Sequence, residues 1–128
     1  MKRIMYAAVF TAMLTAGAGG WVLAQNSFGT PKTILHVSLI QWKAGVSEAD
    51  KQKALDGVKD MAGKIPGIRN VWIKATRVQP EGYHAAFAIE FENQAAADRY
   101  AKDPVHDAWS KAFLAVREAS ISPQITND

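Results

Sequence analysis

The stretch TILHVSLIQWK, residues 33–43, has the composition of a β-strand and is largely apolar on both of its faces. Successive side chains of a strand point to opposite sides of the sheet, so the two faces follow from the sequence. One face carries Ile34, His36, Ser38, Ile40 and Trp42, and the other carries Leu35, Val37 and Leu39. A strand of this kind is covered on both sides. The fold must therefore place a layer of protein against each face.

The next segment has the spacing of an amphipathic helix. Ser47 is a favourable N-cap, and Asp50 follows three residues later as an approximate capping box. Apolar residues then recur at helical spacing, at Leu55, Val58, Ala62 and Ile65. Pro66 cannot continue the helix and Gly67 permits a turn, so we expect a second strand over residues 68–78.

The remaining chain predicts a strand, two helical segments and a final strand. The turn QPEG leads into a third strand over residues 83–92, with Tyr83, Ala85, Phe87, Ile89 and Phe91 on one face. Asn93 caps a short helix, and Asp103 caps a second helix that opens with Pro104. That helix carries an apolar stripe of Val105, Trp109, Ala112, Phe113 and Val116. Residues 117–125 supply the last strand, which belongs at a sheet edge because it contains Pro123.

The order strand–helix–strand–strand–helix–strand predicts an α+β, ferredoxin-like domain. Both helical segments would cover one face of a four-stranded antiparallel sheet. The other face would carry Leu35, Val37, Leu39, Ala86 and Ala88. Apolar surface is costly to leave in water, at about 25 cal/mol per Å². We therefore expect a homodimer in which two sheets pack together; the alternative is a monomer with a thinly hydrophobic outer face.

The N-terminus has the layout of a secretory signal peptide. Lys2 and Arg3 precede an uncharged apolar stretch, and VLA at residues 22–24 forms a cleavage site before Gln25. We expect residues 1–24 to be removed, residues 25–32 to be a flexible lead-in and residues 33–128 to be the domain. The protein would then be periplasmic or secreted, without stable insertion in a membrane. An uncleaved membrane anchor is the rival interpretation, which the glycines at 17, 19 and 20 disfavour.

Charge and cysteine content exclude several kinds of partner. Loss of the signal peptide leaves 13 basic and 12 acidic residues of the original 15 and 12, so the mature chain has a net charge near +1. Nucleic acid is therefore not an expected partner. The chain has no cysteine and only three histidines, so we expect neither a disulfide framework nor a structural metal site. No histidine is singled out as a haem ligand, and we expect no cofactor.

Four stretches together resemble the stress-responsive A/B-barrel (Dabb) family, whose members form dimeric α+β barrels. They are LHVSLIQWKAGVSE, IPGIRNVWI, EGYHAAFAIEFEN and YAKDPVHDAW, and they span most of the mature chain. His36 matches a histidine that the family usually shows in its first strand, and His106 matches one that usually follows the proline. Two positions depart from the family: Asp103 stands where a histidine is usual, and so does Ala85. His84 is one residue away from that second position, and a one-residue offset points to the opposite face.

The spacing Tyr100-x-x-x-Pro104-x-His106 is similar to that of a plant polyketide cyclase of the Dabb family. The resemblance implies His106 as a general base and Tyr100 as the donor that stabilises an enolate oxyanion. The position of His106 in the first helical turn agrees, since the positive helix end favours a neutral imidazole. The alternative is that both residues serve only the corner between two helices.

The sequence and the family resemblance favour an exported, stress-related Dabb-type protein that binds a small organic molecule. The ligand would be a small carbonyl or aromatic compound. His36, Trp42 and Trp109 would line its pocket, although tryptophans in so small a domain often belong to the core. Two alternatives remain open: an enzyme of the cyclase or lyase type that uses Tyr100 and His106, and a structural oligomer without a ligand.

Overall fold

The computed structural model describes residues 28–127. The predicted signal peptide, residues 1–24, and the first three residues of the predicted lead-in therefore lie outside the described residues. In the part of the chain that the structure describes, no helix is both long and apolar enough to cross a membrane.

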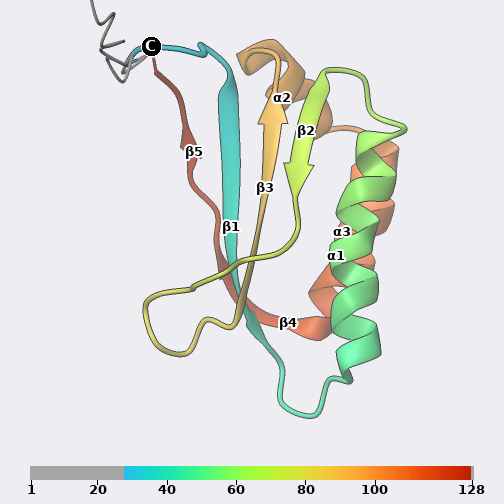
Figure 1. Ribbon diagram of the computed structural model, residues 1–128. Coiled ribbons are helices and arrows are strands. Elements are labelled where there is room, and N and C mark those ends of the chain that lie inside the picture. The colour runs from blue at the N-terminus through green and yellow to red at the C-terminus, as the bar shows by residue number, and fades with distance from the viewer. Residues whose placement is uncertain (1–27, 128) are drawn as a thin grey trace, which may run out of the picture.

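The described chain forms one sheet with its helices on one side (Figure 1). The elements are β1 (Ile34–Trp42), α1 (Glu48–Ala62), β2 (Ile68–Trp72), β3 (Ala85–Phe91), α2 (Gln94–Tyr100), α3 (Pro104–Val116), β4 (Arg117–Ile121) and β5 (Gln124–Ile125). The strand order is β2-β3-β1-β4, with β5 also paired to β1, and every pairing is antiparallel. This is the predicted α+β, ferredoxin-like arrangement.

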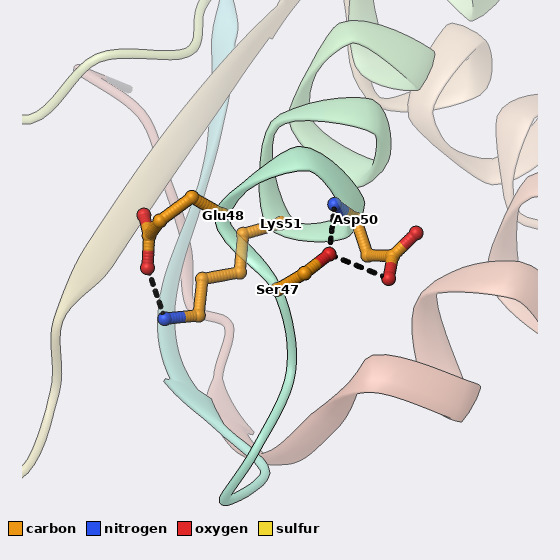
Figure 2. Close-up of polar contacts among 4 residues, drawn as sticks. All are labelled: Ser47, Glu48, Asp50 and Lys51. Atoms are coloured by element: carbon orange, nitrogen blue, oxygen red, sulfur yellow. Dashed lines mark hydrogen bonds and ion pairs between the residues drawn. The ribbon is translucent and has the colours of Figure 1, made fainter.

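Each helix begins where a capping side chain satisfies a free backbone amide. The Ser47 hydroxyl oxygen accepts from the Asp50 amide at 3.1 Å, while the hydroxyl donates to the Asp50 carboxylate at 2.7 Å (Figure 2). Lys51 forms an ion pair with Glu48 in the same turn. The predicted cap Asn93 accepts from the Ala96 amide at 2.9 Å, and the cap before α3 is described with the site.

The hydrophobic core lies between the sheet and the helices. It contains the inward residues of β1 and β3 together with the apolar faces of α1, α2 and α3. The fully or almost fully buried members include Ile40, Val58, Met61, Ile89, Phe91 and Ala96. The predicted facing of β1 and β3 is confirmed, because their buried residues alternate as expected.

The opposite side of the sheet has no helix over it among the described residues. We call it the open sheet face, and define it by residues that the register places on that side. They are Leu35, Val37, Leu39, Trp72, Ala86, Ala88, Ile121 and Ile125. Three of them are large apolar side chains that are about half exposed: Trp72 at 47%, Ile121 at 48% and Ile125 at 54%.

The strand boundaries differ from the expectation in two places. The second strand ends at Trp72 instead of residue 78, and the chain then leaves the sheet in a connection that runs to residue 84. Lys74 and Ala75 lie beside Val37 and Ala86 there. A segment forms a strand only where a neighbouring strand can pair with it, whatever its composition. The partner of β2 is β3, which begins only at Ala85.

The final strand is divided into β4 and β5 at Pro123. Proline has no amide hydrogen to donate to a ladder, so pairing is interrupted at this residue. Its carbonyl still accepts from the Val37 amide at 3.0 Å, which keeps the chain against β1. The predicted edge position of this strand is thereby confirmed.

Candidate functional site

The corner between α2 and α3 brings a tyrosine and a histidine together. α2 ends at Tyr100, whose carbonyl accepts from the Asp103 amide at 3.1 Å. Asp103 then caps α3 by accepting from the Val105 amide at 2.8 Å, and Pro104 occupies the first position of the helix. This tight turn leaves the ring centroids of Tyr100 and His106 only 4.3 Å apart.

His36 reaches the same place from the sheet. It lies on the helix-facing side of β1, with its ring centroid 6.3 Å from that of Tyr100. The three residues share the wall of a cavity of about 240 Å³, which is open to solvent. Aromatic, serine and basic side chains complete the lining: Phe87, Trp109, Phe113, Ser38, Ser110, Ser120, Ser122 and Arg117 are among them. We call this space the histidine cavity.

Trp109 forms the aromatic wall and is fixed from behind by α1. Its indole Nε1–H donates to the Ala54 carbonyl at 2.8 Å. The ring stacks on Phe113 at 4.8 Å between centroids and meets Phe87 edge-on at 5.7 Å. α1 can approach so closely because residue 57 is glycine: a Cβ there would lie 2.5 Å from the indole Cδ1. The position of this wall is therefore set by the packing of α1 on α3.

The polar rim comes from the final strand. The hydroxyls of Ser38 and Ser122 are hydrogen-bonded at 2.9 Å, which joins β1 to the chain between β4 and β5. Arg117 donates from Nη1 to the Ser120 hydroxyl, and its guanidinium carbon lies 5.5 Å from the centre of the Phe113 ring. These groups add hydrogen-bonding capacity to the cavity lining.

Burial controls the ionisation of the three central groups. It lowers the pKa of His36, and the nearby His106 lowers that pKa further. Burial also lowers the pKa of His106, against the opposing effect of Asp107 and Asp103. The direction agrees with the sequence-based expectation of a neutral imidazole, but desolvation is the leading cause in place of the helix end. Burial raises the pKa of Tyr100, so its hydroxyl stays protonated and able to donate.

Two histidines of the cavity lining each have an unsatisfied ring nitrogen. Nδ1 of His36 and Nδ1 of His106 are buried, and neither has a hydrogen-bond partner among the described residues. Buried polar atoms are normally paired, so this arrangement is unusual for a purely structural corner. A neutral imidazole beside a protonated phenol can accept a proton from one atom while the phenol donates a hydrogen bond to another.

The predicted ligand-binding residues divide between cavity and core. His36 and Trp109 line the histidine cavity, together with the predicted catalytic residues Tyr100 and His106. Trp42 does not line it: this side chain is buried in the core and packs edge-on against Phe113 at 6.2 Å. It therefore follows the core interpretation that the sequence left open. His84 is exposed and lies outside the cavity lining, as its offset in the strand suggests.

Sequence reasoning did not identify the polar rim. Ser120, Ser122 and Gln124 alternate along the final strand, and all three line the cavity. That period of two was a usable signal of a polar inward face. Arg117 carried no such signal, because a lone arginine after an amphipathic helix is typical of solvent-exposed surface. Among the described residues, no group of three or more histidines, cysteines or acids could hold a metal ion.

The fold and the cavity together define a ferredoxin-like domain with a site between its sheet and its C-terminal helices. The sequence pattern of the Stress responsive A/B Barrel Domain family (Dabb) matches residues 34–123, and the chain belongs to this family. The resemblance stated from the sequence is thus confirmed. No curated protein matches the chain significantly.

Solved structures of low sequence identity share the fold. A dimeric protein of unknown function from Bacteroides fragilis is 21% identical, with 75% of this chain and 97% of that chain covered and a TM-score of 0.60. The hydroxynitrile lyase of Passiflora edulis is 13% identical, with coverages of 75% and 94% and a TM-score of 0.69. SnoaB, a cofactor-independent oxygenase of Streptomyces nogalater, is 12% identical, with coverages of 75% and 93% and a TM-score of 0.62.

Proposed function

We propose that this protein binds a small organic molecule in the histidine cavity. The carrying observation is an open hollow lined by His36 and His106, whose buried Nδ1 atoms have no hydrogen-bond partner among the described residues. At about 240 Å³ the cavity is smaller than the roughly 300–1,000 Å³ typical of drug-sized sites, which favours a small ligand. Phe87, Trp109 and Phe113 favour an aromatic or other flat group.

Filling the cavity tests this proposal. Ser110 lines the histidine cavity, whereas Ala108 on the same helix lines a different hollow against α1. We expect the Ser110→Phe variant to lose any small molecule that co-purifies with the wild-type protein and is identified by mass spectrometry. The Ala108→Phe variant should retain it. A ligand that survives Ser110→Phe, or a wild-type protein that never carries or binds one, would contradict the proposal.

A second candidate is an enzyme that moves a proton on a small carbonyl compound, in the manner of a cyclase or lyase. The observation that favours it is the 4.3 Å separation of the Tyr100 and His106 rings. His106 would accept a proton from the carbon next to the carbonyl. Tyr100 would donate a hydrogen bond to the carbonyl oxygen as it becomes an enolate. That relatives of this fold are named as a lyase and a cofactor-independent oxygenase supports the idea that the fold can carry reactions.

Exchange of carbon-bound protons separates binding from catalysis. In D₂O, the methyl protons of acetophenone should exchange faster with the wild-type protein than with buffer. His106→Gln should remove most of this acceleration, since general base assistance is worth about 10²–10⁴ in rate. Tyr100→Phe should slow exchange while the ring packing stays in place. Equal exchange rates in wild type and His106→Gln would leave binding as the function and end the catalytic role.

We propose further that the protein is an exported homodimer with a role in stress. The open sheet face supplies an apolar surface for a second copy, and dimeric relatives of the same fold support it. The N-terminal sequence supports export to the periplasm or beyond, and N-terminal sequencing of the mature protein should begin at Gln25. The stress role rests on the family description alone.

A further inference from the structure

Arg117 is the one side chain with a fixed charge in the described lining of the histidine cavity. The lining includes two neutral histidines, serines, a glutamine and aromatic residues, and it includes no aspartate or glutamate. An arginine is charged at every accessible pH. The cavity therefore offers a ligand one positive charge with no acidic side chain in its wall to neutralise it.

The guanidinium is held in place and is only partly used. Nη1 donates to the Ser120 hydroxyl, and the group lies over the Phe113 ring at 5.5 Å. Nε is buried and has no hydrogen-bond partner among the described residues. No acidic residue among residues 28–127 forms an ion pair with Arg117. Nη1 is thus anchored to the protein, and the hydrogen-bonding capacity of the guanidinium is not fully satisfied by the described residues.

We propose that the ligand of this cavity carries a carboxylate, which the guanidinium of Arg117 binds. This inference rests on the proposed binding function and specifies its ligand class. Arginine and carboxylate match as a planar, two-point pair. A single guanidinium balances the single charge of a carboxylate, whereas a phosphate brings close to two charges. The cavity would then take a compact aryl or alkenyl acid, with the acid at Arg117.

The positions of Arg117 and His106 also determine the orientation of the ligand in the cavity. Arg117 begins β4, directly after α3, whereas His106 lies in the first turn of α3 and Tyr100 ends the preceding helix, α2. A carboxylate on Arg117 would direct the uncharged part of the ligand along Trp109 and Phe113 toward the imidazole and phenol. Arg117 is accordingly a specificity-determining residue and takes no part in proton transfer.

Two probes that differ only in charge test the proposal: 4-acetylbenzoate and 4-acetylbenzamide. We expect the wild-type protein to bind the benzoate at least about tenfold more tightly at neutral pH, measured by intrinsic tryptophan fluorescence and by calorimetry. Arg117→Gln should abolish this preference, because it weakens binding of the charged benzoate much more than binding of the neutral benzamide. Arg117→Lys should restore part of it, because the charge returns without the planar fork.

The control is Arg69→Gln, which removes an exposed arginine on β2 outside the cavity lining and should keep the wild-type preference. Equal affinities of the two probes for the wild type would overturn the carboxylate proposal and leave small-molecule binding intact. A preference that persists in Arg117→Gln would also overturn it. If neither probe binds, the carboxylate inference fails, whereas the proposed binding function is decided separately by the co-purifying ligand and the Ser110→Phe variant. The comparison of the two probes on the wild-type protein is valid even if Arg117→Gln does not fold.

Discussion

Both faces of the sheet carry apolar side chains, but helices cover only one of them in the part of the chain that the structure describes (Figure 1). On the helix-covered face, Ile40, Ile89 and Phe91 are buried without any contribution from another molecule. On the open sheet face, Trp72 and Ile121 remain about half exposed although they belong to the same sheet. Alternation along a strand dictates both faces equally. Residues on the first face therefore stabilise the fold, and residues on the second are available to stabilise an assembly.

The largest expected effect is on the covered face. Phe91→Ala should lower the free energy of unfolding by about 3–5 kcal/mol, because it opens a cavity beneath the Tyr100 ring, whose centroid is 4.9 Å away. Chemical denaturation measures this change. Ile125→Ala on the open sheet face removes a side chain that is already 54% exposed and should cost less than about 1 kcal/mol. Equal losses at the two positions would remove the distinction between the faces.

A charge on the open sheet face should act on association. Trp72→Glu is expected to weaken the proposed dimer at least about 100-fold, or about 2.7 kcal/mol, because it places a buried charge in an apolar interface. Sedimentation equilibrium gives the dissociation constant, and circular dichroism should show that the fold is retained. Leu114→Glu is the matched control, since Leu114 is 46% exposed but lies on α3. A wild-type protein that is monomeric at micromolar concentration would refute the dimer.

The next largest effect on stability is expected at Gly57, where α1 packs closely against Trp109. Gly57→Ala should lower the free energy of unfolding by about 1–3 kcal/mol, because the new Cβ would meet the Trp109 ring at 2.5 Å. The shifted indole should also change the tryptophan emission. Gly63→Ala, at the end of the same helix, meets only the Asp60 carbonyl at 3.6 Å and should be tolerated. A Gly57→Ala variant as stable as wild type would show that α1 is free to move outward.

The smallest effect is a pH dependence confined to the covered face. The native state lowers the pKa values of His36 and His106 below 6.5, the ordinary value that applies to the unfolded chain. As the pH falls below about 6.5, the unfolded chain binds protons that the native state does not, so stability decreases toward the native pKa values. Above 6.5 this contribution is constant.

Denaturation at a series of pH values measures the slope, which should stay below about 1.4 kcal/mol per pH unit for His36 and be smaller for the more exposed His106. His36→Gln should flatten the profile, and His84→Gln provides the same change at an exposed position. A stability that rises on acidification would contradict the assignment of buried, neutral imidazoles.

Sequence alone gave the element order, the caps and the facing of the strands, because these depend on local spacing. Ser47, Asn93 and Asp103 could be recognised as caps from a few neighbours each. The juxtaposition of Tyr100 and His106 was also local, since a proline-containing turn separates them. His36 lies far away along the chain, and the resemblance to the family was needed to associate it with that pair.

The composition of the cavity wall depended on tertiary packing, which local sequence spacing does not specify. Trp42 and Trp109 both lie on apolar faces of their elements, yet one is buried against Phe113 and the other lines the cavity. The difference comes from how α3 crosses the sheet, which spacing does not specify. Arg117 was missed for the same reason: its role depends on Ser120 and Phe113, and on the absence of an acidic partner among the described residues.

The indole of Trp109 connects the cavity to α1: it donates a hydrogen bond to the Ala54 carbonyl of that helix, and it forms a wall of the cavity. Occupancy of the cavity and the rigidity of α1 are therefore thermodynamically linked. A guest that immobilises the ring should slow amide hydrogen exchange in the middle of α1, on a helix that the guest never touches.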